Sequence, residues 1–404
     1  MMGGQSNTKR LETDQSWLSR SVLGFGLASL LSDAGHEAAT ATLPAFLVTL
    51  GAAPAALGLI EGLADGLASF SKLFGGWLAD EPRRRKPIAV AGYLTTGLST
   101  GALALATSWL HVLGARSVGW LARGLRGPAR DAMLADSVPR EALGRAFGFH
   151  RAMDTAGAIA GPALAALLAS TLRPRSIFWW ALVPGVLAAG AFAVLVRPHD
   201  GKRIDPQPFW RSVGALSPRY RRFLAAVFLF GAGDFARTLL ILRASELLRP
   251  GLGVVMATEL SMLLYVGHNV LYAVASYPVG WMADRVSPER LLVAGYLLGT
   301  LTAVLAALAT PSVGMLVALF AVAGLTLAFE DTLEGTITAH QVPLGIRGTG
   351  YGTLAAANGV GDLVSSALVG VLWSLAGPGV AFGAAAALCL AGTVVLAAAQ
   401  VKQG

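Results

Sequence analysis

The chain has 404 residues, of which 54% are hydrophobic and only 13% are charged, and its formal net charge is +8. Soluble domains average roughly 25% charged residues, so this composition excludes an ordinary soluble domain and indicates an integral membrane protein. The basic residues lie in short segments between long apolar runs, which is typical of cytoplasmic loops and argues against nucleic-acid binding.

The first segment, from Met1 to Trp17, is polar and has no apolar stretch followed by a small-residue cleavage site, so we expect no cleaved signal peptide. Twelve apolar segments follow, each near the roughly 20 residues that a helix needs to cross a bilayer. They predict an all-α integral membrane fold with spans over residues 20–47, 55–79, 87–109, 111–134, 144–172, 176–196, 222–248, 253–283, 290–309, 312–338, 347–372 and 377–400.

The distribution of Lys and Arg predicts the orientation of these spans. If the N-terminus is cytoplasmic, 20 of the 31 basic residues fall in cytoplasmic segments and only three fall on the opposite side. Both termini are therefore predicted to be cytoplasmic.

One long polar connection, residues 197–221, separates the sixth span from the seventh and contains Pro206 and Pro208. It divides the chain into an N-terminal six-helix half, residues 1–196, and a C-terminal six-helix half, residues 222–404. Trp210 in this linker is expected at the lipid interface.

The two halves are related by a shift of 204 residues, which indicates a tandem duplication. The segment Gly76-Trp77-Leu78-Ala79-Asp80 returns as Gly280-Trp281-Met282-Ala283-Asp284, and the glycines 144, 148 and 157 return at 348, 352 and 361. In this register, Arg126 corresponds to Glu330 and Arg130 to Glu334, so equivalent positions carry opposite charges.

Several predicted helices carry ionisable residues, each of which costs roughly 2.5 to 3.5 kcal/mol at mid-membrane and therefore faces a partner or a water-filled cavity. Asp33, His36 and Glu37 lie within one turn of the first helix and could share a proton near neutral pH, as a proton-coupling site requires. Alternatively, they pair with arginines elsewhere and only stabilise the bundle.

Further candidates for proton coupling or substrate contact lie on six other helices. They are Glu61, Asp65, Arg123, His150, Asp154, Asp234, Arg237, His268 and Asn358. Asp234 and Arg237 are close enough to neutralise each other, and a single histidine such as His268 is more often hydrogen-bonded packing than a ligand.

The sequence contains no His-Glu-x-x-His motif, no pair of cysteines and no phosphate-binding loop. No nucleophile has an identifiable base either. We therefore expect no metal, no cofactor, no direct use of ATP and no enzymatic activity.

Six plus six helices, a cytoplasmic linker and a repeated Gly-Trp-x-Ala-Asp segment resemble the major facilitator superfamily. The loop signature of that family is matched at Gly76, Asp80 and the following arginines, although Glu81-Pro82 departs from it, and it returns at Gly280 and Asp284. Arg123 and Arg126 resemble the arginine motif of the family's fourth helix. Residues Gly157, Gly161 and Pro162 resemble the Gly-Pro motif of proton-driven exporters.

This resemblance implies a monomeric secondary transporter of a small solute in a lipid bilayer, expected in the bacterial cytoplasmic membrane, whose halves rock by alternating access. Proton antiport for efflux is favoured, and proton symport for uptake stays open. Other classes are a receptor or scaffold that lost transport and an intramembrane enzyme.

Two groups of residues are expected to control conformation. Gly76, Asp80 and Asp284 either hold the two halves together or only shape turns. The 204-residue register places Arg126 and Arg130 opposite Glu330 and Glu334 as a cytoplasmic gate, unless these arginines pair within their own half with Asp131, Asp136 or Asp80.

Overall fold

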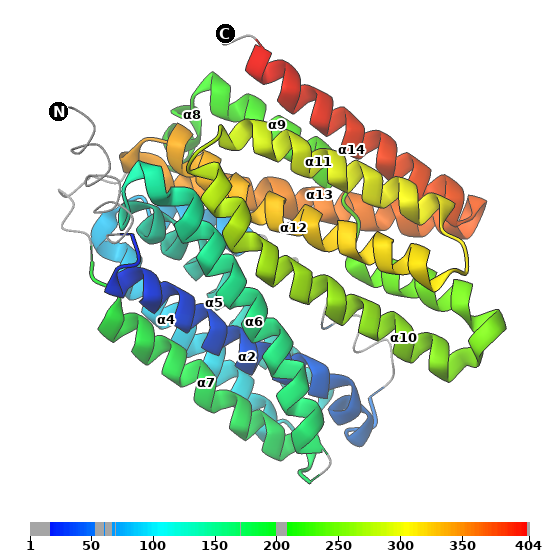
Figure 1. Ribbon diagram of the computed structural model, residues 1–404. Helices are drawn as coiled ribbons and strands as arrows, with labels where there is room; N and C mark the ends of the chain where they lie inside the picture. Colours follow the sequence, from blue (N-terminus) through cyan, green and yellow to red (C-terminus); the bar gives the residue numbers. More distant parts are fainter. Residues whose placement is uncertain are drawn as a thin grey trace, which may run out of the picture.

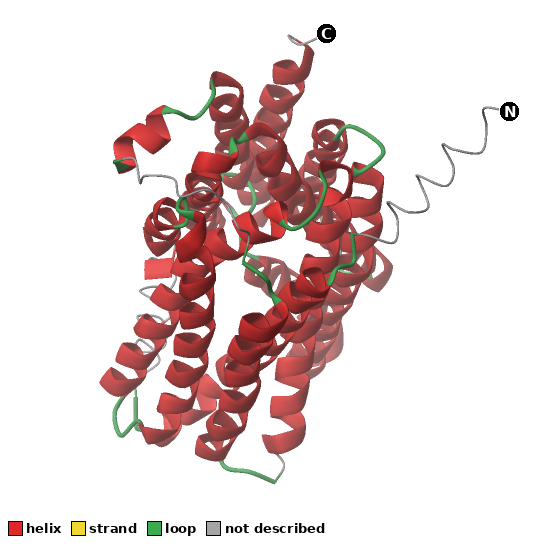
Figure 2. Cartoon of the chain, turned by 90° about the vertical axis from the view of Figure 1, so that its left-hand side faces the viewer, coloured by secondary structure: helices red, strands yellow, loops and turns green. Residues whose placement is uncertain are grey.

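The computed structural model describes residues 17–401 except 53–59, 61–66, 69, 170 and 199–207. Regular structure in this part of the chain is helical, and short loops join the helices (Figure 2). The all-α prediction is confirmed.

Five labelled helices form the N-terminal group: α2 (Arg20–Thr49), α4 (Pro82–Ala102), α5 (Trp109–Asp136), α6 (Leu143–Ala169) and α7 (Pro174–Leu195). Residues 70–78 are also helical and belong to the predicted second span. The C-terminal group is α9 (Pro218–Gly231), α10 (Arg237–Ala283), α11 (Pro288–Leu308), α12 (Val313–Gln341), α13 (Arg347–Ala376) and α14 (Pro378–Val401). Shorter elements are α8 (Phe209–Gly214), η1 (Leu103–Leu105), η2 (Arg140–Ala142) and η3 (Leu344–Ile346).

The helices pack mainly within their own group (Figure 1). Helix α2 packs against α6 and α7, and α4 packs against α5 and α7. The C-terminal group repeats this arrangement, because α9 packs against α13 and α14, and α11 packs against α12 and α14. The groups meet through α6 with α10 and α12, and through α5 with α13.

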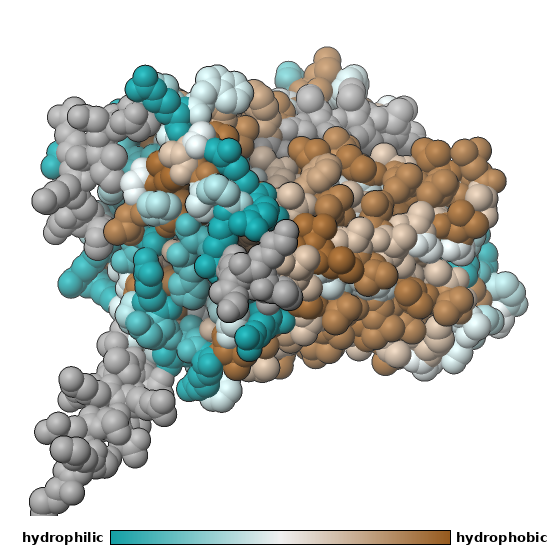
Figure 3. All heavy atoms as spheres, turned by 90° about the horizontal axis from the view of Figure 1, so that it is seen from above, coloured by the Kyte–Doolittle hydropathy of each residue, from teal (hydrophilic) through white to brown (hydrophobic). Residues whose placement is uncertain are grey.

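The two groups lie closest at the end of the molecule where α2 begins and α14 ends, and they diverge toward the other end in both ribbon views (Figures 1 and 2). Hydrophilic residues gather at this closed end, while hydrophobic residues cover much of the rest of the face seen in Figure 3. Six described helices are long and apolar enough to cross a membrane, namely α4 with η1, α7, α11, α12, α13 with η3, and α14. Helices α2, α5 and α6, which carry interior charges, are not among the six.

The prediction of a continuous helix over 222–248 is wrong. Helix α9 ends at Gly231, residues 232–236 are not helical, and α10 begins at Arg237. Gly233 allows this break to pass close to α14, because a Cβ atom there would lie 2.5 Å from the carbonyl oxygen of Ala385. The non-helical segment, which includes Asp234, is thereby placed inside the bundle.

The predicted boundary between the seventh and eighth spans lies inside α10. There Gly253 has a φ of 74°, a left-handed conformation that only glycine adopts readily, and the helical hydrogen-bonded path changes direction. Gly253 thus marks the turn between spans that the sequence places at residues 249–252.

Candidate functional site

Asp33 and Arg123 form an ion pair between α2 and α5 in the N-terminal group. Arg123 Nη1 lies 2.9 Å from Asp33 Oδ1, and Nη2 donates to Oδ2 at 3.2 Å. The Asp33 side chain is 5% exposed and that of Arg123 is 24% exposed, so Arg123 is the more accessible member of the pair. Asp33 thus pairs with an arginine of another helix, which is the second of the two alternatives that the sequence left open.

His36 has a different set of neighbours from Asp33. The His36 ring contacts Trp120 edge-on at 5.1 Å, and the guanidinium of Arg123 lies 5.7 Å from the centre of the Trp120 ring. Glu37 contributes to the electrostatic field at Arg123. Trp120 is therefore a shared neighbour of His36 and Arg123.

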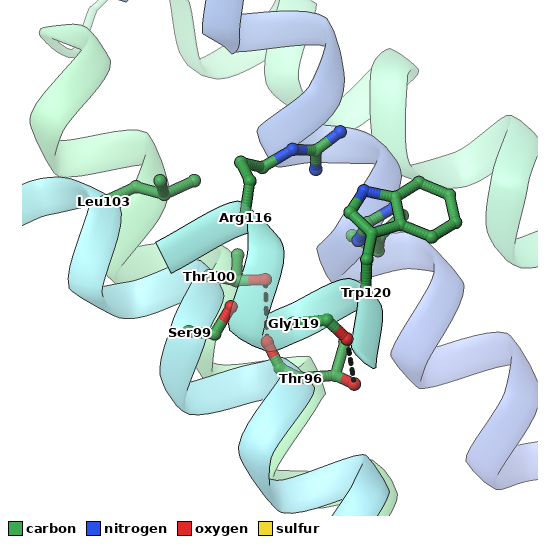
Figure 4. Close-up of a pocket in the computed structure, with 8 residues that line it drawn as sticks. Thr96, Ser99, Thr100, Leu103, Arg116, Gly119 and Trp120 are labelled. Carbon is green, nitrogen blue, oxygen red and sulfur yellow. Dashed lines mark hydrogen bonds between the residues drawn. The ribbon is translucent and has the colours of Figure 1, made fainter. Parts of the chain in front are cut away.

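A small cavity lies beside His36 and Trp120. Figure 4 shows Arg116 and Trp120 projecting from α5 toward α2. The volume of the cavity is about 10 Å³, which is about the space of one water molecule. The lining residues are His36, Thr96, Ser99, Thr100, Leu103, Arg116, Gly119 and Trp120. His36 Nε2 has no hydrogen-bond partner among the described residues, so a water in this cavity is a suitable partner for it.

Arg130 lies at the centre of a second network. Its Nε lies 2.9 Å from Asp131, and its Nη1 lies 3.9 Å from Asp154 on α6 and 3.4 Å from the Ser29 hydroxyl on α2. Ser29 also contacts His150 Nε2 at 2.8 Å. Ser29 of α2 and Arg130 of α5 therefore contact His150 and Asp154, which share one face of α6 as the sequence predicts.

Arg126 is buried one turn before Arg130 and has an aromatic neighbour. Its guanidinium carbon lies 3.9 Å from the centre of the Tyr93 ring, and Nη1 is 3.5 Å from Thr96 Oγ1. This cation–π contact lies wholly within the N-terminal group.

In the C-terminal group, Asp234 and Arg237 flank the break between α9 and α10. Arg237 donates to both carboxylate oxygens of Asp234, at 2.8 and 3.0 Å. The predicted mutual neutralisation is confirmed, and the pair holds the first residue of α10 against the non-helical segment.

Glu334 on α12 accepts hydrogen bonds from Tyr296 and Asn358, each at 2.7 Å. Asn358 thus acts as a partner of Glu334 from α13. Glu330, one turn earlier, is buried, and its Oε2 has no hydrogen-bond partner among the described residues.

The predicted ion pairs of Arg126 and Arg130 with Glu330 and Glu334 are not formed in this conformation among the described residues. Arg126 contacts Tyr93, and Glu334 accepts a hydrogen bond from Tyr296, so each of these side chains is engaged within its own group and not across the interface. Arg130 instead pairs within its half with Asp131, the alternative from the sequence.

Two aspartates join the groups at the closed end. Asp80 accepts from the backbone N–H of Thr349 at 2.8 Å and from its hydroxyl at 2.5 Å, at the start of α13. Asp284 accepts from the backbone N–H groups of Gly144 and Arg145 at 2.7 and 3.2 Å, at the start of α6, and from Arg145 Nε at 2.7 Å. These reciprocal contacts, which we call the two locks, place carboxylates where helix N-termini favour negative charge.

Burial raises the pKa of both lock aspartates, and the hydrogen bonds that they accept oppose this shift. The helix N-termini are therefore needed to keep these carboxylates ionised when they are withdrawn from water.

Glycines allow the close approach that the locks require. A Cβ atom at Gly280 would lie 2.0 Å from the carbonyl oxygen of Gly144, and one at Gly76 would lie 2.5 Å from that of Gly348. The recurrence of these glycines in both halves thus has a steric cause, since only glycine fits at these crossings.

Asp136, at the end of α5, makes a third connection that the sequence did not assign to the interface. It pairs with Arg85 of the N-terminal group and with Arg347 of the C-terminal group. From the sequence, Asp136 was expected only as a partner for arginines of its own half. Arg347, at the start of the predicted eleventh span, was the basic residue that could have indicated a contact between the groups.

The remaining candidates have structural surroundings or lie outside the description. Gly157 and Gly161 pack against the backbone of α2, where Cβ atoms would lie 2.3 and 2.5 Å from carbonyl oxygens, and Pro162 continues α6. His268 is buried, with Nδ1 3.4 Å from the carbonyl oxygen of Phe320, in line with a packing role. Glu61 and Asp65 lie outside the described residues.

Comparisons with known proteins agree with this arrangement. The family model described as "Major Facilitator Superfamily" matches residues 25–258 and 244–402 of the chain. An uncharacterized MFS-type transporter of Methanocaldococcus jannaschii is 29% identical over 377 residues, covering 92% of each chain. The quinolone resistance protein NorA of Staphylococcus aureus is 27% identical over 167 residues, 41% of this chain and 42% of NorA. The solved structure of FucP in the outward conformation has a TM-score of 0.75 and 15% identity, covering 96% of this chain and 100% of FucP.

Proposed function

The chain belongs to the Major Facilitator Superfamily, and from this we propose that it is a proton-coupled secondary transporter that expels a small organic solute. It is a multi-pass membrane protein with the fold of that family. Transport by alternating access requires two halves that can close at either end around a central site.

One observation carries the proposal: the two locks lie at one end of the molecule and the halves diverge toward the other (Figure 1). If the closed end is cytoplasmic, as the basic residues indicate, the described state faces outward. Water can replace the polar contacts of the locks when this end opens.

The interior offers groups that suit an ionised solute and a proton. Arg123 is partly exposed beside Asp33. Asp362 on α13 is exposed, and the positive charges of Lys72 and Arg237 act on it. Export is favoured over uptake by the helix-five glycines with Pro162 and by the partial likeness to a quinolone resistance protein.

The test is flux in proteoliposomes made with the purified full chain, with a fluorescent quinolone as the first probe and a panel of organic cations and zwitterions after it. An imposed proton gradient should move a probe against its own gradient, in exchange for protons. Asp33→Asn is the comparison variant and should reduce flux, because it leaves the partly exposed Arg123 without its counter-charge in the interior.

If the probe moves in the same direction as the protons, the protein is a proton symporter, and uptake replaces efflux as the proposed function. The absence of gradient-driven flux for every probe, together with no proton movement when the probes are added, would overturn the proposal and favour a receptor or scaffold.

A further inference from the structure

Glu330 is a buried acid that lacks the partners its neighbours have. Its side chain is only 7% exposed, and Oε2 is wholly buried with no hydrogen-bond donor among the described residues. Glu334, one turn further along α12, accepts from two donors. The difference between these two glutamates is what requires an explanation.

Most of the nearby donors are already engaged. Arg237 directs both terminal nitrogens to Asp234, the Tyr296 hydroxyl and the Asn358 amide donate to Glu334, and the Tyr272 hydroxyl donates to Asp331. Arg237 Nε is the donor atom of this set that has no partner, and it forms no hydrogen bond with Glu330.

Acids outnumber cations around Glu330. The groups whose charges act in this region are Asp234 and Arg237 from the break between α9 and α10, Asp331 and Glu334 from α12, Asp362 from α13, the hydroxyl of Tyr296 from α11, and the thiol of Cys389 from α14. Arg237 is the one cation of this set, and Asp234 already neutralises it. An ionised carboxylate without a donor or a counter-charge is strongly disfavoured in such a site.

We propose that Glu330 is the residue that binds the coupling proton. This inference rests on the proposed proton-coupled transport and assigns the proton to α12 of the C-terminal group. In the described state the Glu330 carboxyl holds the proton on one oxygen.

Release of this proton to water in the opened cavity leaves an anion that is attracted to Arg237. The guanidinium is then shared between Asp234 and Glu330. Because Arg237 is the first residue of α10 and its partner lies in the non-helical segment, this exchange of partners moves the break between α9 and α10. The protonation of Glu330 is thus linked to the position of one helix of the C-terminal group.

A proton fits this site better than a metal ion does. Hard cations such as Ca²⁺ take 6–8 oxygen ligands, whereas Glu330 offers one unpartnered oxygen, and within the described ranges no group of three His, Cys, Asp or Glu residues could hold a metal ion. Asp33 is a poorer proton site in this state, because Arg123 faces both of its oxygens.

The test is infrared difference spectroscopy of the purified full chain between alkaline and acidic pH, which detects the C=O band of a protonated buried carboxyl and needs no solute. The wild type should show this band, and Glu330→Gln should lose it. Glu246→Gln, which removes an exposed acid elsewhere on α10, and Asp33→Asn should both keep it.

Loss of the band in Asp33→Asn with its retention in Glu330→Gln would overturn the assignment. If Glu330→Gln does not fold, Glu330→Asp keeps the carboxyl, and its band should shift in frequency; an unshifted band would also contradict the proposal.

Flux separates this inference from the proposed function. In proteoliposomes with a transported probe, Glu330→Gln should retain probe exchange at equal pH and lose at least tenfold of the gradient-driven flux. A band that depends on Glu330 in a protein that moves no probe would contradict the transport proposal and leave the proton site standing. Full gradient-driven flux in Glu330→Gln would remove Glu330 from the coupling step.

Discussion

At the scale of single residues, the interior charges are arranged so that most have a partner from another helix. Asp33 on α2 meets Arg123 on α5, and Arg130 on α5 reaches Asp154 on α6. Burying one member of such a pair without the other costs far more than the pair itself contributes. These contacts therefore fix which helices can be neighbours more than they raise the free energy of unfolding.

Asp33→Asn should lower the stability of the purified protein by about 1–3 kcal/mol, because a partly buried guanidinium loses its counter-charge. Arg123→Gln should have a similar effect. The double variant should be more stable than the sum of the two single effects implies, since it leaves no unpaired charge. Thermal unfolding in detergent for the four proteins gives the coupling energy. A coupling energy of zero would show that the pair does not interact energetically.

Trp17 is a residue whose contacts the sequence did not anticipate. It is 7% exposed, stacks on Tyr277 of α10 at 5.8 Å, meets Phe149 of α6 edge-on at 6.2 Å, and lies 5.6 Å from the guanidinium of Arg145. It therefore covers the lock that Arg145 makes with Asp284 and touches both groups of helices.

Trp17→Ala should favour opening of the closed end, by about tenfold if the lost aromatic contacts contribute about 1.4 kcal/mol. Spin labels on α6 and α10 at this end would report the change as a larger population of long distances. Trp210→Ala is the control, because Trp210 on α8 is 80% exposed. Equal effects of the two substitutions would refute a specific role for Trp17.

At the scale of helices, the crossing of α6 and α10 depends on glycine. Gly144 and Gly280 meet backbone to backbone. Gly267 also lies on α10, but an added Cβ atom there would have nothing within 4 Å. The same amino acid therefore has different roles at two positions of one helix.

Gly280→Ala should prevent the normal approach of α6 and α10, because the added methyl group would lie 2.0 Å from a carbonyl oxygen. The closed end should open, and cysteines placed across the crossing should cross-link at least tenfold more slowly. Gly267→Ala should leave the cross-linking rate unchanged. If Gly280→Ala cross-links at the wild-type rate, the contact does not limit closure.

The helices themselves could largely be predicted, and their interruptions could not. Long apolar runs require helices in a bilayer because every backbone group must find a partner within the chain. The break at residues 232–236 contains no proline, and its one glycine, Gly233, resembles the many glycines that lie within continuous helices. What distinguishes it is the packing of Gly233 against α14, a contact between residues far apart in sequence.

The candidate site could be predicted as a set of residues but only partly as a set of pairs. Asp234 and Arg237 are three residues apart, so their pairing follows from helix-scale geometry. Arg126 and Glu330 are equivalent by repeat, but equivalence says nothing about whether two faces point toward one another. The lock of Asp80 could be anticipated because a helix end with an acid favours a facing helix N-terminus.

At the scale of the whole molecule, the closed state depends on contacts between the two groups at one end. The locks of Asp80 and Asp284 are related by the same 204-residue shift as the sequence repeat. Each lock is a small polar contact, and the two act on the same motion.

Asp80→Asn and Asp284→Asn should each favour the open state by about tenfold, since a hydrogen bond to a charged group contributes about 1.5–3 kcal/mol and asparagine retains part of it. The double variant should show about the product of the two effects if the locks act independently. Distance distributions between spin labels across the closed end provide the measurement. A double variant that opens no more than either single one would show that one lock alone holds this end.

Each group of helices supplies both partners of a lock, an aspartate at the end of one helix and an N-terminus at the start of another. A surface of this kind is self-complementary about a two-fold axis, like the isologous interface of a symmetric dimer. An ancestor that encoded only six helices could thus have closed as a pair of identical subunits through the same two contacts. The fusion of its two copies then left each half free to diverge inside, where one now carries mainly arginines on its fourth helix and the other carries glutamates at the equivalent positions.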